Sequence, residues 1–164
     1  MKFFSRSWLD DLAAEAARSP RLRQSRNLHE SYGEPCQRLF NAICESSYIR
    51  PHRHSLDPKT ECLVAVRGCM TLVLFDDAGE LVEAVRFGVS GCDGAAHVGV
   101  ELPPGAWHTV LADTPDAILF EVKAGPFDPS QAKELASWAP EEGSDGAAPY
   151  LSDLKRRVAQ RLAR

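Results

Sequence analysis

Between Cys36 and Lys123 the chain is a series of short apolar runs separated by turn residues, with no helical periodicity between them. Runs of this kind, bounded by glycine, proline and aspartate, are typical of β-strands. Strands are predicted at residues 36–43, 48–54, 60–67, 69–76, 80–87, 97–102, 106–112 and 116–123. The turns Arg67-Gly68 and Asp76-Asp77-Ala78-Gly79 join neighbouring runs closely, which predicts antiparallel hairpins. Because parallel strands need crossover helices, a parallel sheet is excluded and a sandwich or barrel is predicted.

Helices are predicted on both sides of this region. Leu9, Leu12 and Ala16 keep helical spacing within residues 7–18, and Ser19-Pro20 ends that helix because proline disfavours a helical residue before it. Further helices are predicted at residues 130–138 and 150–162. We therefore predict one mainly β domain over residues 1–164, composed of an N-terminal helix and basic loop (1–35), a β-barrel (36–125) and a C-terminal helical extension (126–164).

The charge balance and hydropathy exclude several classes of partner. The 164 residues include 19 lysines and arginines and 23 acidic residues, for a net charge of −4. An acidic balance argues against nucleic-acid binding. No apolar run approaches the roughly 20 residues that a membrane helix needs, so no membrane partner is expected. The first eleven residues are too polar for a signal peptide, and we expect a cytoplasmic location.

The cysteine pattern favours reduced thiols. The count of five is odd, the spacings are wide, and there is no C-x-x-C pair. We expect small buried hydrophobic side chains at Cys36, Cys44, Cys62, Cys69 and Cys92.

The histidines of the β region indicate a metal site. His52 and His54 are two residues apart in a predicted strand, so their side chains point to the same face. Glu61 opens the next strand, from which its carboxylate can return to the same space. His108 supplies a third imidazole just after the turn residues Leu102-Pro103-Pro104-Gly105. Imidazoles on rigid strands are suitable ligands for divalent transition metals.

These motifs resemble those of cupins. His52-x-His54 with Glu61 and Gly68 is similar to the first cupin motif, and Pro103-x-Gly105-x-x-His108 is similar to the second. The match is closer still to cupin-fold metalloproteins of the WbuC family, which are often encoded with bacterial surface-polysaccharide genes. The residues that carry this resemblance lie within about residues 20–142: Arg26-Asn27-x-His29, Gln37-Arg38, Ser47-Tyr48-Ile49-Arg50-Pro51-His52-Arg53-His54, Lys59-x-Glu61, Phe75-Asp76-Asp77-x-Gly79, Trp107-His108-Thr109, Glu121-x-Lys123-x-Gly125-Pro126 and Trp138-Ala139-Pro140.

The resemblance implies a double-stranded β-helix, or jelly-roll barrel, with a metal bound inside by His52, His54, His108 and Glu61. The gap between His54 and Glu61 is longer than in the general cupin pattern, which makes Glu61 the weaker of the four ligands. The second motif also lacks its usual opening glycine, because residue 97 is histidine. The implied cofactor is a divalent transition metal, with Zn, Fe, Mn, Ni and Co all suited to such ligands.

Other polar residues are candidates for catalysis and substrate binding. The expected catalytic residues are Lys59, Glu61 and His29, which could move protons near the metal. The expected substrate-binding residues are Arg26, Arg50, Tyr48, Glu121 and Lys123. The alternative for His29 is a surface loop histidine, and the alternative for the charged residues is ordinary ion pairing.

Two main functions and a lesser one follow. The first is a metal-dependent enzyme acting on a small polar or sugar-type substrate, as an isomerase, an epimerase or an oxygenase, and the family resemblance links it to surface-polysaccharide metabolism. The second is a non-catalytic, metal-dependent sensor or small-molecule binding module. A purely structural metal ranks last, because a chain of this length folds without one. By analogy with cupins we expect a homodimer.

Overall fold

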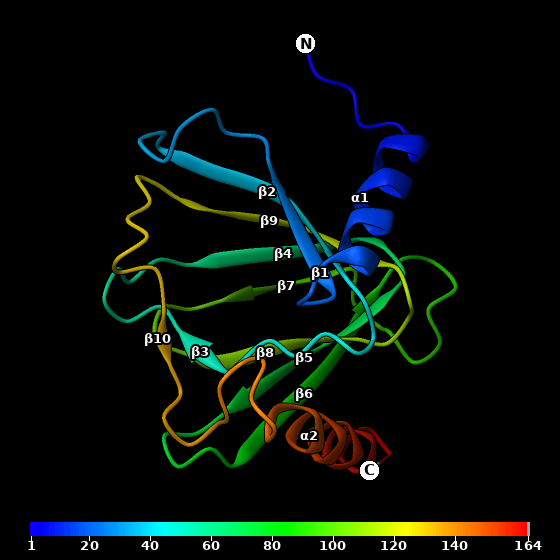
Figure 1. Ribbon diagram of the computed structural model, residues 1–164, viewed down its shortest axis with the longest axis vertical. Coiled ribbons are helices and arrows are strands. Elements are labelled where there is room, and N and C mark those ends of the chain that lie inside the picture. Colours follow the sequence, from blue (N-terminus) through cyan, green and yellow to red (C-terminus); the bar gives the residue numbers. More distant parts are fainter. Residues whose placement is uncertain (164) are drawn as a thin grey trace.

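The computed structural model describes residues 1–163, which form two five-stranded antiparallel sheets and two α-helices (Figure 1). The first sheet has the strand order β1-β2-β9-β4-β7, and the second has the order β10-β3-β8-β5-β6. Strands far apart in the chain, such as β2 with β9 and β3 with β8, are therefore hydrogen-bonded neighbours. This connectivity is that of a jelly roll and confirms the predicted fold class.

Most of the elements lie where the sequence predicts them. The strands are Arg23–Asn27 (β1), Cys36–Ile43 (β2), His52–Arg53 (β3), Glu61–Arg67 (β4), Cys69–Phe75 (β5), Leu81–Gly88 (β6), Gly99–Leu102 (β7), Trp107–Ala112 (β8), Ala117–Ala124 (β9) and Glu134–Leu135 (β10). The helices are Arg6–Arg18 (α1) and Ala147–Leu162 (α2). The main differences are at β1, β10 and the start of α2. In addition, β3 and β7 are shorter than the strands predicted at residues 48–54 and 97–102.

Each helix covers the outer face of one sheet (Figure 1). Leu12 and Ala16 of α1 pack on Phe40 and Ile118 of the first sheet. Leu151, Leu154 and Val158 of α2 pack against residues of β5 and β8 in the second sheet. Among residues 1–163, no helix is both long enough and apolar enough to cross a membrane.

The space between the sheets changes from apolar to polar along the strands. Successive side chains of a strand point to opposite faces, so alternate residues of β9 share the inner face. Ala117 and Leu119 belong to the buried apolar cluster between the sheets, whereas Glu121 and Lys123 follow on the same face. In β4, Leu63 is likewise in the cluster and Glu61 lies beyond it. The polar ends of these strands form the candidate site.

The segment after α1 is a strand, although the sequence indicated a basic loop. β1 pairs with β2 in antiparallel register, from Arg23 opposite Ile43 to Asn27 opposite Leu39. The strand lacks apolar alternation because it lies at the edge of its sheet, where side chains remain accessible. Arg26 lies over the Trp8 ring of α1, with the guanidinium carbon 4.5 Å from the ring centroid.

The predicted helix at residues 130–138 is wrong. This segment consists of turns and β10, which pairs with β3. The Arg53 guanidinium donates two hydrogen bonds of 2.8 Å to the Glu134 carboxylate, and the Ala136 N–H donates to the Pro51 carbonyl at 2.9 Å. These contacts with a distant strand outweigh a weak local helical pattern.

The expectation that every cysteine is a buried free thiol is also wrong. Cys69 and Cys92 form a disulfide that joins the start of β5 to the loop after β6. Cys36 is exposed, and Cys44 and Cys62 are half-buried.

Candidate metal centre

Three buried imidazoles meet at the polar end of the barrel. His52 and His54 come from β3 and its C-terminal flank, and His108 lies directly opposite His52 in the neighbouring strand β8. One ring nitrogen from each of the three lies within 4.8 Å of the others. The ring centroids of His52 and His108 are 4.5 Å apart. Strand alternation explains the shared direction of His52 and His54, and sheet pairing brings in His108.

A backbone carbonyl fixes the tautomer of each imidazole. The Nδ1 atom of His52 lies 3.0 Å from the Arg50 carbonyl oxygen, and that of His108 lies 2.9 Å from the Ala106 carbonyl oxygen. The Nδ1 atom of His54 lies 2.5 Å from the Ala132 carbonyl oxygen. A carbonyl only accepts, so each Nδ1 carries the hydrogen and each Nε2 presents a lone pair. Metal-bound histidines are commonly held in this way, with the ring nitrogen that does not face the metal donating to a carbonyl.

Glu61 completes the cluster. One oxygen of its carboxylate, Oε2, lies 3.4 Å from the Nε2 atoms of both His54 and His108. The other oxygen, Oε1, lies 3.6 Å from the Lys123 ammonium. Burial alone would raise the pKa of Glu61, but the adjacent His108 and His54 side chains and the nearby Lys123 charge hold it well below its ordinary value. The long gap after His54 therefore does not keep Glu61 away from the imidazoles.

The donor set fits a divalent transition metal. Burial, the Lys133 charge and His108 hold the pKa of His52 well below its ordinary value, so this imidazole is neutral, as a ligand must be. The Nε2 atom of His54 is buried and has no hydrogen-bond partner among residues 1–163. Three imidazole nitrogens within 4.8 Å of one another, with a carboxylate oxygen 3.4 Å from two of the rings, match the ligand types of Zn, Fe, Mn, Ni or Co.

Several other expected site residues lie close to this cluster. The Lys123 ammonium donates to Glu121 Oε1 at 2.9 Å, within reach of Glu61. Burial and the Glu61 charge raise the pKa of Glu121 to about 7. Lys59 forms a 2.6 Å ion pair with Asp57 and donates to the Pro126 carbonyl, at a small cavity that His54 also lines.

Three expected substrate-binding residues are held elsewhere. The Arg26 guanidinium is paired with Glu15 of α1 at 2.8 Å. The Arg50 guanidinium donates to the Ala136 carbonyl at 2.8 and 3.0 Å. The Tyr48 hydroxyl donates to the Pro140 carbonyl at 2.9 Å, and its ring belongs to the cluster beneath α2. In this structure these three side chains connect segments of the fold.

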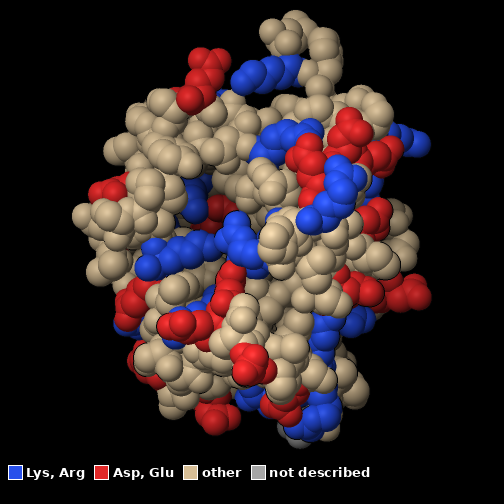
Figure 2. Space-filling model, viewed as in Figure 1, with Lys and Arg blue, Asp and Glu red and all other residues tan. Residues whose placement is uncertain are grey.

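Two neighbouring cavities lie beside the cluster. A cavity of about 50 Å³ lies against His52 and Glu61, and a second of about 260 Å³ is lined by His29. The two share Asn41, Glu121 and Lys133 in their walls. A hollow in which basic and acidic side chains meet is visible at the level between the sheets (Figure 2).

The sequence analysis missed Lys133, Asn41 and the role of Gln37. Lys133 lies in the segment that was wrongly predicted to be a helix, and a lysine in a short surface helix is normally interpreted as solvent-exposed. Gln37 and Asn41 occupy inner-face positions of β2, and their alternation with apolar residues was the available signal.

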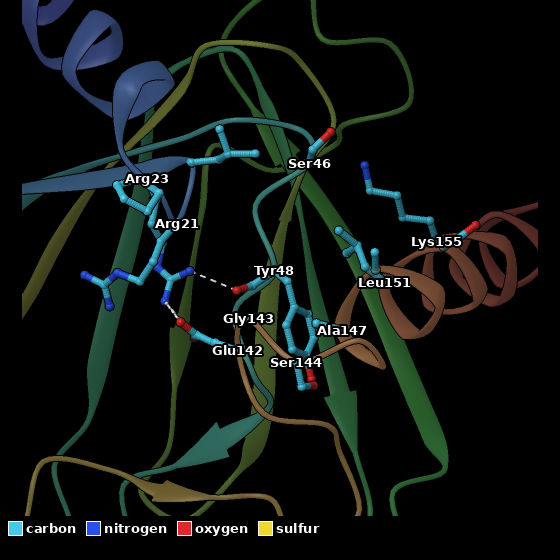
Figure 3. A pocket seen from close by; sticks show the side chains of 14 residues that line it. Arg21, Arg23, Ser46, Tyr48, Glu142, Gly143, Ser144, Ala147, Leu151 and Lys155 are labelled. Atoms are coloured by element: carbon cyan, nitrogen blue, oxygen red, sulfur yellow. Dashed lines mark hydrogen bonds and ion pairs between the residues drawn. The ribbon is translucent and has the colours of Figure 1, made fainter.

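The largest cavity lies away from the imidazoles. This groove of about 660 Å³ is bordered by the segment before β1, the segment after β2 and the start of α2 (Figure 3). Arg23 crosses one side of it and binds Glu142 through two hydrogen bonds of 2.5 and 2.6 Å. Within residues 1–163 the groove's lining includes no histidine or cysteine, so its size does not make it the site of metal chemistry.

The fold and the site together define a class of protein. A structural-genomics target protein from Shewanella oneidensis matches with 15% identity over 85% of each chain and a TM-score of 0.55. An oxalate oxidase in complex with the substrate analogue glycolate matches with 13% identity over 88% of this chain and 76% of that chain, with a TM-score of 0.55. KdgF from Halomonas sp. matches with 15% identity over 69% of this chain and 87% of that chain, with a TM-score of 0.50. The protein has the cupin fold.

A family model identifies the chain more specifically. The model is described as a domain of unknown function (DUF6016), and it matches residues 4–87, which is just over half of the chain. The protein belongs to this family. The matched region runs from α1 to β6 and so includes His52, His54 and Glu61, but not His108. The comparison with curated proteins found no match.

Proposed function

We propose that the protein is a metal-dependent enzyme that acts on a small polar or sugar-type substrate. The observation that carries this proposal is the convergence of three Nε2 lone pairs and the Glu61 carboxylate in a buried site beside an open cavity. A metal bound there would polarise a carbonyl or hydroxyl group of the substrate. The proposed ligands are His52, His54, His108 and Glu61.

The surrounding residues suit proton transfer. The pKa of Glu121, about 7, allows this carboxyl to accept or release a proton near neutral pH. Lys123 lies between the Glu121 and Glu61 carboxylates and would keep the pair in place. These groups favour an isomerase or epimerase, in which a proton is removed and returned. Measuring oxygen consumption would distinguish an oxygenase from an isomerase or epimerase.

The resemblance to the WbuC family supports a role in surface-polysaccharide metabolism. Some of its motif residues meet at the site, namely His52, His54, His108, Glu61, Glu121 and Lys123. The same resemblance supports a homodimer, which sedimentation would distinguish from a monomer.

A test of metal binding comes first. We expect purified protein supplied with Zn, Mn, Fe, Ni or Co in turn to retain about one equivalent of at least one metal by elemental analysis. His52→Ala, His54→Ala and His108→Ala should each lose most of it. His97→Ala, which changes an exposed histidine, should retain it. Retention of metal by the three site variants, or no stoichiometric metal in the wild type, would contradict the proposal.

The alternative function is a non-catalytic metal-dependent sensor or binding module. It is favoured by the lack of an assigned nucleophile among the described site residues. Incubation of metal-loaded protein with panels of monosaccharides, sugar acids and keto acids separates the two. Turnover that disappears in His52→Ala supports the enzyme, whereas ligand binding without turnover supports the sensor.

A further inference from the structure

The cavity of about 260 Å³ beside the candidate metal centre contains an unused hydrogen-bond donor. His29 is 8% exposed and lines this cavity. His29 Nδ1 lies 3.1 Å from the Arg38 nitrogen, whose N–H donates to it, and 3.0 Å from the Arg38 carbonyl oxygen. The carbonyl also accepts from the Leu28 N–H at 2.8 Å, whereas the Arg38 N–H needs Nδ1 as its acceptor. Nδ1 is therefore the acceptor, and Nε2 carries the hydrogen. This Nε2–H is buried without a partner among residues 1–163.

The same cavity contains an unused acceptor. Gln37 is 1% exposed, and its amide nitrogen donates to the carbonyls of Tyr32 at 3.2 Å and Glu34 at 2.9 Å. These two bonds fix the orientation of the amide, so its oxygen is the atom left over. Gln37 Oε1 has no hydrogen-bond partner in the described part of the chain. An unsatisfied buried acceptor of this kind favours a ligand that donates a hydrogen bond.

A lysine supplies positive charge between this cavity and the metal centre. Lys133 lines both neighbouring cavities, and within residues 1–163 it forms no ion pair. Lys123 differs because it is paired with Glu121 and Glu61. Burial lowers the pKa of Lys133, and the Glu121 and Glu61 charges act in the opposite direction.

We propose that this chamber, lined by His29, Gln37 and Lys133, binds a sugar acid of monosaccharide size, with the carboxylate between Lys133 and the His29 Nε2–H and a hydroxyl donating to Gln37 Oε1. This inference rests on the proposed function, because it names the substrate class of the same site. A charged ammonium and an N–H donor select an anion. The unpaired amide oxygen of Gln37 selects a hydroxyl group over a second anion. The chamber is smaller than the roughly 300–1,000 Å³ of pockets for drug-sized ligands, so a single sugar ring fits better than a sugar nucleotide.

The direct test compares acidic and neutral sugars of the same stereochemistry. D-glucuronate and D-galacturonate would be titrated calorimetrically into metal-loaded protein, alongside D-glucose and D-galactose. We expect at least one acid to bind about 10-fold or more tightly than its neutral counterpart, because hydrogen bonds to charged groups are the stronger ones. Equal affinities for the acids and the neutral sugars would overturn the inference without any variant.

Substitutions in the chamber test whether its residues cause the preference for the acidic sugar. Lys133→Met should reduce the preference for the acid by about 10-fold or more, Lys133→Arg should retain much of it, and Gln37→Leu should weaken acids and neutral sugars alike. Lys155→Met is the matched control, because Lys155 lies in the larger groove and binds the Glu45 carbonyl. Unchanged acid binding by Lys133→Met would overturn the assignment.

Metal-free protein separates this inference from the proposed function. Neither His29 nor Lys133 is a proposed ligand, so the preference for the acid over the neutral sugar should persist after chelation, even if both bind more weakly. If the protein binds no metal but prefers the acid, the proposed function is contradicted and the inference about the chamber is supported. If it binds metal but shows no preference for the acid, or shows that preference only when metal is present, the inference about the chamber is contradicted and the metal site is supported.

Discussion

Single residues in the candidate metal centre depend on the backbone around them. The carbonyls of Arg50, Ala106 and Ala132 accept from the three imidazoles and so direct the three Nε2 atoms inwards. Ala132 belongs to the segment that crosses the site before β10, so the orientation of His54 depends on a part of the chain 78 residues away. Metal affinity is therefore set by the fold as well as by the ligands.

The role of Glu61 can be tested by removing its charge. Glu61→Gln keeps the size of the side chain but removes the carboxylate that faces His54 and His108. We expect the metal dissociation constant to rise by about 10- to 100-fold, measured by competition with a chelator. Glu101→Gln, which changes an exposed carboxylate on β7, is the matched control. Wild-type affinity in Glu61→Gln would remove Glu61 from the site.

For Tyr48 we predict a change in stability without a change in metal binding, in contrast to Glu61. Its hydroxyl donates to the Pro140 carbonyl, so Tyr48→Phe should destabilise the protein by about 1 kcal/mol in urea unfolding. Metal content and sugar-acid affinity should not change, because the ring packs beneath α2. A loss of metal or ligand affinity with unchanged stability would restore the substrate-binding role that the sequence suggested.

The sequence was sufficient to predict the imidazole cluster but not the chamber. His52 and His54 share a strand face, and the cupin-like motif around His108 made it the third ligand. Lys133 and Gln37 carry no such mark. Their environment depends on where β10 crosses and on which backbone carbonyls fix the Gln37 amide.

At the level of elements, α2 and the connector before it are attached to the first sheet through one ion pair. Arg23 of β1 donates two hydrogen bonds to Glu142 and one, of 2.8 Å, to the Tyr48 carbonyl. The Arg23 side chain is 11% exposed and that of Glu142 is 30% exposed, so the pair is only partly screened by water. Glu142 thereby holds the connector against β1.

Glu142→Gln tests this attachment and its pH dependence. Burial alone would raise the pKa of Glu142, but the Arg23 hydrogen bonds and charge lower it below its ordinary value of 4.5. A carboxyl with a lowered pKa stabilises the fold above that ordinary value and loses this contribution as pH falls through the lowered one. We expect the wild type to be more stable than Glu142→Gln by about 1 kcal/mol at pH 7.

The stability difference should shrink progressively below pH 4.5, as denaturant unfolding at a series of pH values would show. Glu141→Gln is the control, because Glu141 is exposed and approaches Arg50 only to 3.8 Å. A difference between wild type and Glu142→Gln that stays constant with pH would mean that the ion pair does not stabilise the fold.

The strands that the sequence predicted well are those with an apolar inner face. β2 and β4 to β9 all contribute to buried clusters, and their periodicity is visible without a structure. β1 and β10 are at sheet edges and are stabilised by polar contacts with distant residues, such as Arg53 with Glu134. Local periodicity contains no information about such contacts, which is why one was read as a loop and the other as a helix.

At the scale of the whole molecule, we expect the barrel to fold without a metal. The apolar cluster between the sheets and the clusters under α1 and α2 are formed by residues outside the candidate metal centre. The polar end of the barrel instead places neutral imidazole lone pairs and charged groups close together. A bound metal would offset the repulsion between these lone pairs and the carboxylate in the folded protein. The unfolded chain offers no equivalent site, so metal binding would stabilise the folded state.

Chelation should therefore lower the melting temperature without unfolding the protein at 25 °C. Bound metal at 100 times its dissociation constant stabilises a folded protein by about 2.7 kcal/mol. For a chain of this size that corresponds to a shift of roughly 5–10 °C, measured by circular dichroism with and without a chelator. His108→Ala provides the control, since chelator should hardly move the melting temperature of a variant that lacks the site. Unfolding of the wild type by chelator alone would show that the metal is structural, and would favour the function ranked last from the sequence over a catalytic one.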